Sequence, residues 1–169
     1  MLFGQTFEST SITKEILQRL TKEVEKESEN YKRSIAENDN GQALTAFSVD
    51  TFRIEQLSAK RSKLDFSTSD MNITISQMRD SYDKLLNKYY KKLLNLLQAE
   101  DKDALIKAQK AWLLFRDKES KLIWTLKKNE YSGGGTIQHI LANDAELSFL
   151  KERVIELFSY YNNIVNGEQ

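Results

Sequence analysis

Side chains suited to acid–base or metal chemistry are scarce in this sequence. It contains one histidine, His139, and no cysteine. A di-iron helical bundle requires a Glu three residues before a His on each of two helices, and position 136 is Thr136. Zinc sites and Ser–His triads also require partners for a single His that this sequence does not offer. We therefore predict no catalytic site, no metal site and no cofactor, and expect His139 at the surface or at a helix end.

A run of glycines precedes the last helical pattern. Gly133, Gly134 and Gly135 are followed by Thr136, and such a run can present free backbone N–H groups to an anion. The phosphate-binding loop, however, places a Lys before its Ser or Thr, and this run has none. A flexible turn between two helices, with Thr136 capping the second, is the favoured interpretation.

Charged and aromatic side chains meet around Trp112. Arg116 lies four residues after Trp112 on one helical face, where stacking on the ring contributes about 0.5–2 kcal/mol. Asp117 is next in the chain, and we expect it to form an ion pair with Arg116 that holds two helices together. A carboxylate pair for glycoside hydrolysis would need a cleft and a defined separation between the two groups, which the sequence does not indicate.

The charge pattern indicates neither a nucleic-acid partner nor a membrane span. The chain has 25 basic and 25 acidic residues, and no apolar run approaches the roughly 20 residues that cross a bilayer. Residues 83–128 carry 12 basic and 6 acidic side chains, whereas residues 129–169 carry 2 and 6. Three tyrosines interleaved with lysines (Tyr82, Tyr89 and Tyr90) follow the apolar stripe of a predicted helix, so we expect them in the core rather than stacked on bases.

Long helices must position these residues. The 169-residue chain has no proline and only six glycines, which favours few, long helices. We predict helices over residues 10–38, 43–63, 71–97, 105–123 and 137–161; the second also alternates like a strand around Phe47, but no partner strand is evident. Ser67 and Asp70 form a capping pair before the third helix.

The predicted fold is all-α, an antiparallel up-down bundle of three to four long helices with an additional N-terminal helical arm. We divide the chain into residues 1–64, a helical arm or hairpin of unknown role, and residues 65–169, the bundle domain. Trp112 is expected to be the core anchor of the bundle.

Several short motifs recur together in one family. The run Ala-Gln-x-Ala-Trp-x-x-Phe-Arg-Asp is the most specific of them, and a Met-Asn pair, a Gly-Gly-Thr-Ile element and a Glu-Arg pair accompany it. Over residues 67–160 the chain thereby resembles the LprI N-terminal-like family, the domain of the LprI-type lysozyme inhibitors. The motif residues, which we expect to be mainly structural, are Met71, Asn72, Asp83, Asn87, Tyr90, Gln109, Trp112, Phe115, Arg116, Asp117, Gly134 and Gly135. Positions at which members of the family often carry cysteines hold Thr74, Ser120 and Ala145.

The resemblance implies an exported, non-enzymatic protein that binds a protein partner, a lysozyme, in the periplasm or outside the cell. Because lysozymes are usually basic, an acidic presenting surface is expected, and the last helix supplies Asp144, Glu146, Glu152 and Glu156. Residues 1–5 are too short for a signal peptide and are either the end of one or a plain start, so a cytoplasmic location is the alternative. The alternative function is a structural module that self-associates through its charged N-terminal helix; the sequence leaves the oligomeric state open.

Overall fold

Six helices account for nearly all of the residues that the structure describes. The computed structural model describes residues 11–36 and 41–167, and no strand occurs among them. The helices are α1 (Lys14–Ala36), α2 (Gln42–Leu64), α3 (Thr68–Leu96), α4 (Lys102–Leu126), α5 (Asn129–Ser132) and α6 (Ile137–Asn166). The all-α prediction is confirmed. The short α5 was not predicted, because its four residues carry no periodic signal.

The helix starts follow local hydrogen bonding. At α3 the Ser67 hydroxyl accepts the backbone N–H of Asp70 at 3.2 Å, which confirms the predicted cap. At α1 the corresponding group is Thr13, whose hydroxyl accepts the N–H of Ile16 at 3.3 Å. Thr136 was expected to cap the last helix, but its side chain accepts no capping hydrogen bond.

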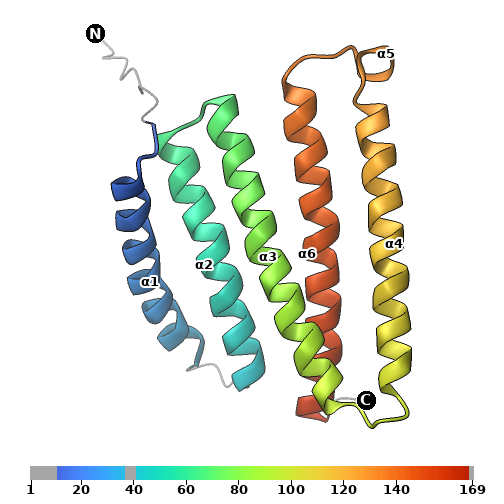
Figure 1. Cartoon of the computed structure of the whole chain (residues 1–169). Coiled ribbons are helices and arrows are strands. Elements are labelled where there is room, and N and C mark those ends of the chain that lie inside the picture. Colours follow the sequence, from blue (N-terminus) through green and yellow to red (C-terminus); the bar gives the residue numbers. More distant parts are fainter. Residues whose placement is uncertain (1–10, 37–40, 168–169) are drawn as a thin grey trace.

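The five long helices lie side by side in the order α1, α2, α3, α6, α4 (Figure 1). Consecutive long helices run in opposite directions, as the short connections predict. α6, however, lies between α3 and α4 and runs in the same direction as α3. The reason is that α6 is apolar on more than one side: Leu147 and Val154 are buried in the core cluster that includes α3, while Phe149 meets Phe115 of α4 with ring centroids 5.9 Å apart.

The core lies where α2, α3 and α6 meet. Tyr89 of α3 and Val154 and Leu157 of α6 have no exposed surface. Phe47 of α2 stacks on Phe158 of α6 at 3.9 Å between centroids, and Tyr89 meets both rings edge-on. The prediction that Trp112 anchors the core is corrected: Trp112 is only partly buried and packs at the margin of this cluster, because α4 joins the bundle from the outer side of α6.

Polar contacts hold α1 against α2. Arg53 of α2 donates to the buried hydroxyl of Ser28 at 2.9 Å and pairs with Glu25 at 3.0 Å. Lys60 pairs with Glu27 at 2.8 Å. Leu20 and Val24 are the buried apolar residues of α1, which matches the single apolar stripe seen in its sequence.

A buried ionic network closes the turn between α2 and α3. The Arg61 guanidinium pairs with Asp70 and donates to the Thr74 hydroxyl at 2.9 Å and to Gln77 at 2.8 Å. The side chains of Arg61 and Asp70 are 4% and 6% exposed. Removing either partner would leave a buried charge without its counter-ion.

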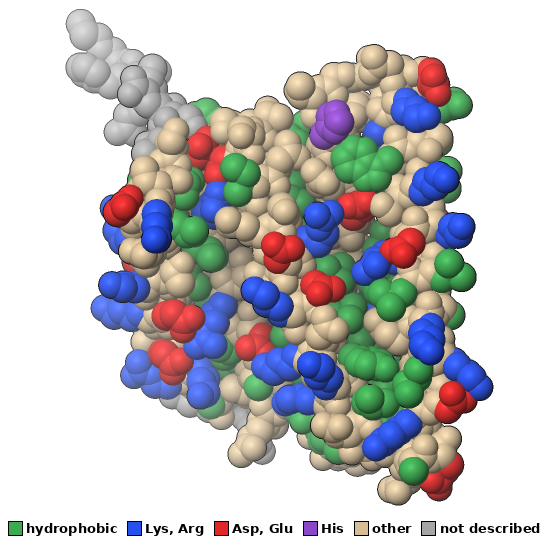
Figure 2. Space-filling view, viewed as in Figure 1, with side chains coloured by type: hydrophobic (Ala, Val, Ile, Leu, Met, Phe, Trp, Pro, Cys, Tyr) green, Lys and Arg blue, Asp and Glu red, His purple; other side chains and the backbone are tan. Residues whose placement is uncertain are grey.

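Charges of both signs are interspersed over the face of the molecule shown in Figure 2. No helix in the described ranges combines the length and the apolar character that crossing a bilayer requires.

Candidate functional site

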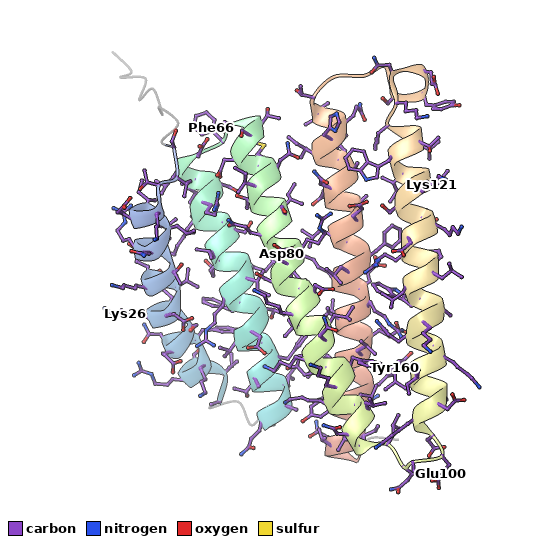
Figure 3. All side chains as sticks on the ribbon, in the orientation of Figure 1. Lys26, Phe66, Asp80, Glu100, Lys121 and Tyr160 are labelled. Carbon is purple, nitrogen blue, oxygen red and sulfur yellow. The ribbon has the colours of Figure 1, made fainter. Side chains whose placement is uncertain are left out.

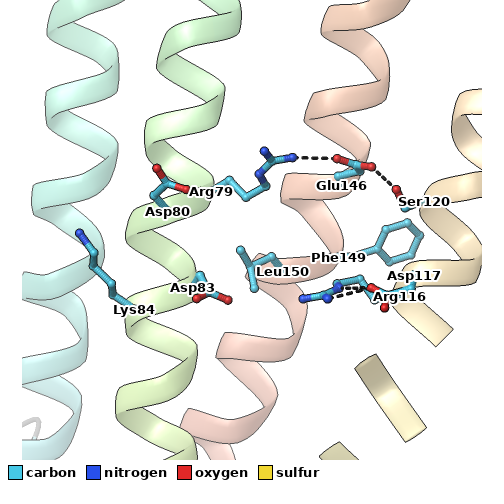
Figure 4. Close-up of a pocket in the computed structure, with 10 residues that line it drawn as sticks. All are labelled: Arg79, Asp80, Asp83, Lys84, Arg116, Asp117, Ser120, Glu146, Phe149 and Leu150. Carbon is cyan, nitrogen blue, oxygen red and sulfur yellow. Dashed lines mark hydrogen bonds and ion pairs between the residues drawn. The ribbon is translucent and has the colours of Figure 1, made fainter. Parts of the chain in front are cut away.

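A groove of about 700 Å³ opens between α3 and α4, with α6 as its floor (Figure 4). It forms because α3 and α4 flank α6 and are held apart by it. The floor is formed by Glu146, Phe149 and Leu150. The walls carry charged and polar side chains: Arg79, Asp80, Asp83 and Lys84 from α3, and Arg116, Asp117 and Ser120 from α4.

Glu146 ties the three helices of the groove together. It pairs with Arg79 of α3 at 2.9 Å, accepts the indole N–H of Trp124 at 2.8 Å, and accepts the hydroxyl of Ser120. Its side chain is 15% exposed. Glu146 is therefore largely occupied inside the molecule, whereas Asp144 and Glu152 of the same helix are exposed.

Two opposite charges face each other over an apolar part of the floor. Arg116 extends from α4 toward α3 beside Leu150, and Asp83 lies opposite it on α3 (Figure 4). Arg116 pairs with its chain neighbour Asp117 at 2.8 Å. The expectation that this pair joins two helices is wrong, since both residues belong to α4. The groove thus presents a guanidinium, carboxylates and an apolar floor to any group that enters it.

The remaining residues of the tryptophan motif link α4 to α6. Arg153 is buried and its Nε donates to the Gln109 side chain at 3.0 Å. The guanidinium carbons of Arg116 and Arg153 lie 5.5 and 5.8 Å from the Trp112 ring centroid, which confirms the predicted stacking of Arg116. The role of Arg153 was missed, although its Glu-Arg pair accompanies the motif in the sequence.

Other motif residues have local structural roles. Asn72 of α3 accepts the side-chain amide of Asn143 of α6 at 2.9 Å, and Asn87 donates to Asp83 at 3.1 Å. Tyr90 packs against the core, and Met71 is partly buried. Phe115 is half exposed.

The glycine run turns the chain back from α4 toward α6. Gly134 and Gly135 have φ angles of 79° and 93°, which other residues rarely adopt. A Cβ atom on Gly134 would also collide with the side chain of Asn129. The positive φ angles and the lack of space for a side chain at Gly134 support the predicted turn.

Two of the three positions that the resemblance aligned with cysteines hold residues whose side chains form hydrogen bonds. Thr74 is buried and accepts from Arg61 at 2.9 Å, and Ser120 donates to Glu146.

The other candidate residues lie outside the groove. His139 is exposed in the first turn of α6, as predicted, with its ring 5.5 Å from that of Trp124. Tyr82 and Tyr89 are buried, as predicted, and burial raises the pKa of both hydroxyls far above the ordinary value. Among the described residues, no group of three or more His, Asp or Glu side chains is arranged to hold a metal ion.

The motif residues therefore fall into two sets. Most of them maintain the fold, including Gln109, Trp112 and Asn72. Within the described chain, no hydrogen bond or ion pair of Asp83, Arg116 or Asp117 joins two helices, and all three residues line the groove.

Fold and site define a small all-α protein in which signature residues on α4 and α6 fasten two helices beside an open groove. The chain belongs to the lysozyme inhibitor LprI family: the model of that family matches residues 59–157, more than half of the chain. No curated protein and no solved structure matches it.

Proposed function

We propose that this protein is an exported, non-enzymatic binding protein that inhibits a lysozyme, and that the groove between α3 and α4 contributes to the contact. Membership of the LprI family supports the choice of partner. The convergence of Asp83, Arg116 and Asp117 on the groove is the structural observation that carries the proposal. These motif residues are exposed or partly exposed, and among the residues that the structure describes none of their hydrogen bonds or ion pairs joins two helices, so a binding role accounts for their positions.

The groove suits a projecting segment of a partner protein. Its apolar floor at Phe149 and Leu150 can accept the aliphatic part of a side chain, and its rims offer charges of both signs. Seven charged residues line it, four acidic and three basic, so a basic partner meets a slight excess of negative charge. Rim charges mainly affect the association rate and partner choice. We therefore expect inhibition to weaken as salt rises.

Inhibition assays against a panel of lysozymes test the proposal. At micromolar concentration the wild-type protein should inhibit at least one of them. Asp83→Lys and Arg116→Glu should each raise the concentration for half-inhibition by about tenfold or more, with unchanged helix content by circular dichroism. Glu100→Lys is the matched control, because Glu100 is an exposed acid in the α3–α4 turn, at the far end of the molecule (Figure 3).

Two results would contradict the proposal. Absence of inhibition of every lysozyme by the wild-type protein would remove the function. Undiminished inhibition by both groove variants would place the contact elsewhere on the molecule. Fractionation of the producing cells tests export, since the protein should appear outside the cytoplasm.

The second candidate is a structural module that self-associates through its charged N-terminal helix. In the structure Arg53 and Lys60 of α2 engage charged residues of α1, which favours a role for α1 inside the chain. Light scattering on a variant without residues 1–40 separates the two candidates, since an unchanged oligomeric state defeats self-association through α1.

A further inference from the structure

Large apolar side chains are exposed mainly on one half of the molecule. On α4, Phe115, Leu122 and Leu126 are 48–51% exposed, and on α6, Ile137, Leu141 and Ile155 are 44–56% exposed. Among the described residues of α1 and α2, no large apolar side chain reaches comparable exposure. Contiguous exposed apolar surface commonly marks an interface with another protein.

These six residues form two stripes, one of three residues on α4 and one of three residues on α6. At about 100° per residue, Phe115, Leu122 and Leu126 share one side of α4, and Ile137, Leu141 and Ile155 share one side of α6. The stripe on α6 points away from the groove, since Ile155 lies roughly 140° around the helix from the groove residue Leu150. The stripe therefore belongs to a second surface, distinct from the groove.

Contacts between α4 and α6 set the two stripes level with each other. Trp124 meets His139, Ser120 bonds to Glu146, and Gln109 bonds to Arg153. This antiparallel register places Leu126 level with Ile137 and Leu122 level with Leu141. The exposed Ala108 is likewise level with Ile155. We refer to the surface formed by Ala108, Phe115, Leu122, Leu126, Ile137, Leu141 and Ile155 as the hairpin face; on α6 the exposed Ser148 lies between Leu141 and Ile155.

The charges beside the hairpin face differ between the two helices. On α4, Lys118 and Lys121 are exposed; on α6, Asp144 and Glu152 are exposed. Within the described chain no ion pair is recorded for these four side chains. The register places Asp144 level with Lys118 and Lys121. Asp144 of α6 is thus at the same height along the helices as the two lysines of α4, whereas Glu152 is level with Ala111.

We propose that the hairpin face binds a second copy of this chain. A two-fold axis parallel to the helices lays α4 of each copy over α6 of the other, which buries both apolar stripes. The same operation keeps heights unchanged, so Lys118 and Lys121 of one copy meet Asp144 of the other. A two-fold interface requires such a self-complementary surface. The two helices present a strip about 27 Å long and about 20 Å wide, and its charged margins extend this toward the roughly 800 Å² per partner of a standard interface.

Sedimentation velocity on the full chain tests the proposal. At concentrations of about 1–100 µM the wild-type protein should shift from monomer to dimer. Leu122→Glu should leave a monomer throughout that range, because it introduces a charge at the centre of the stripe. Ile73→Glu is the matched control: Ile73 is 47% exposed on α3, outside the hairpin face, and the variant should dimerise like the wild type.

Charge reversal provides a test that does not depend on the apolar variant folding. Replacing Lys118 and Lys121 by Glu should weaken the dimer by about tenfold or more, and adding Asp144→Lys to that variant should restore it. Four results overturn the proposal: a monomeric wild type at every concentration, equal weakening by Ile73→Glu, no response to charge reversal, or no restoration by Asp144→Lys. A monomeric wild type whose lysozyme inhibition is lost on Leu122→Glu would assign the hairpin face to the lysozyme instead. Because inhibition is measured separately, failure of the dimer leaves the groove proposal intact.

Discussion

Arg153 explains why a distant Glu-Arg pair accompanies the tryptophan motif. Its buried guanidinium bonds to Gln109 and to Glu156 and lies over the Trp112 ring. A buried guanidinium is tolerated only where its donors find partners, and Gln109 and Glu156 supply them. The motif residues therefore hold α4 against α6. They recur at the spacing of residues that share one face of a helix.

Trp112→Ala tests this fastening. Truncating a fully buried Trp to Ala lowers the free energy of unfolding by about 3–5 kcal/mol. Trp112, however, is only partly buried at the margin of the core. We expect destabilisation of about 2–3 kcal/mol by urea denaturation. A change below about 1 kcal/mol would show that the indole contributes little to holding α4 and α6 together.

The pKa of Glu156 should lie below its ordinary value. The Tyr160 hydroxyl and the Arg153 guanidinium hydrogen-bond to its carboxylate and lower its pKa below 4.5. Because the folded-state pKa lies below the unfolded value, ionised Glu156 stabilises the fold at neutral pH, and this contribution is lost as pH falls through the folded-state pKa. In an NMR titration, Tyr160→Phe should raise the pKa of Glu156. An unchanged pKa in that variant would show that the hydroxyl is not responsible.

At the scale of the elements, the turn between α2 and α3 depends on Arg61 and Asp70. Asp70→Asn leaves the Arg61 charge buried and unpaired, and should cost about 3–5 kcal/mol of unfolding free energy. The double variant Arg61→Met/Asp70→Leu removes both charges and should lose much less stability than the single one. Chemical denaturation of the three proteins provides the comparison. A double variant at least as unstable as Asp70→Asn would mean that the ion pair itself stabilises the turn.

The position of α6 could not be predicted from its sequence pattern. Periodicity identified the helix, but a helix that is apolar on several sides can pack in more than one order with its neighbours. Contacts on separate sides, Phe158 on Phe47 of α2 and Phe149 on Phe115 of α4, place it between the other helices. The groove between α3 and α4 follows from that position.

For the whole molecule, the division between residues 64 and 65 stays a prediction. The family match begins at residue 59, inside α2, and Phe47 of α2 packs into the core. We expect a protein of residues 41–169 to remain folded, since α1 contacts the rest mainly through α2. A protein of residues 65–169 should lose cooperative unfolding because Tyr89 and Phe158 would be uncovered. Thermal unfolding followed by circular dichroism measures the cooperativity of unfolding of both shortened proteins. Cooperative unfolding of the 65–169 protein would support the proposed boundary.

The sequence alone determined the properties that depend on neighbours within a few residues. The approximate positions of the five long helices, the Ser67 cap, burial of Tyr82 and Tyr89, and stacking of Arg116 on Trp112 all follow from local hydrogen bonding or from the period of one helix. The tertiary structure decided the rest. The bonds from Gln109 to Arg153 and from Asn72 to Asn143 join residues 44 and 71 positions apart, and spacing along one helix contains no information about which side of another helix it will meet. The groove and the hairpin face depend on such pairings, because each is formed by residues that only the packing of α3, α4 and α6 brings together.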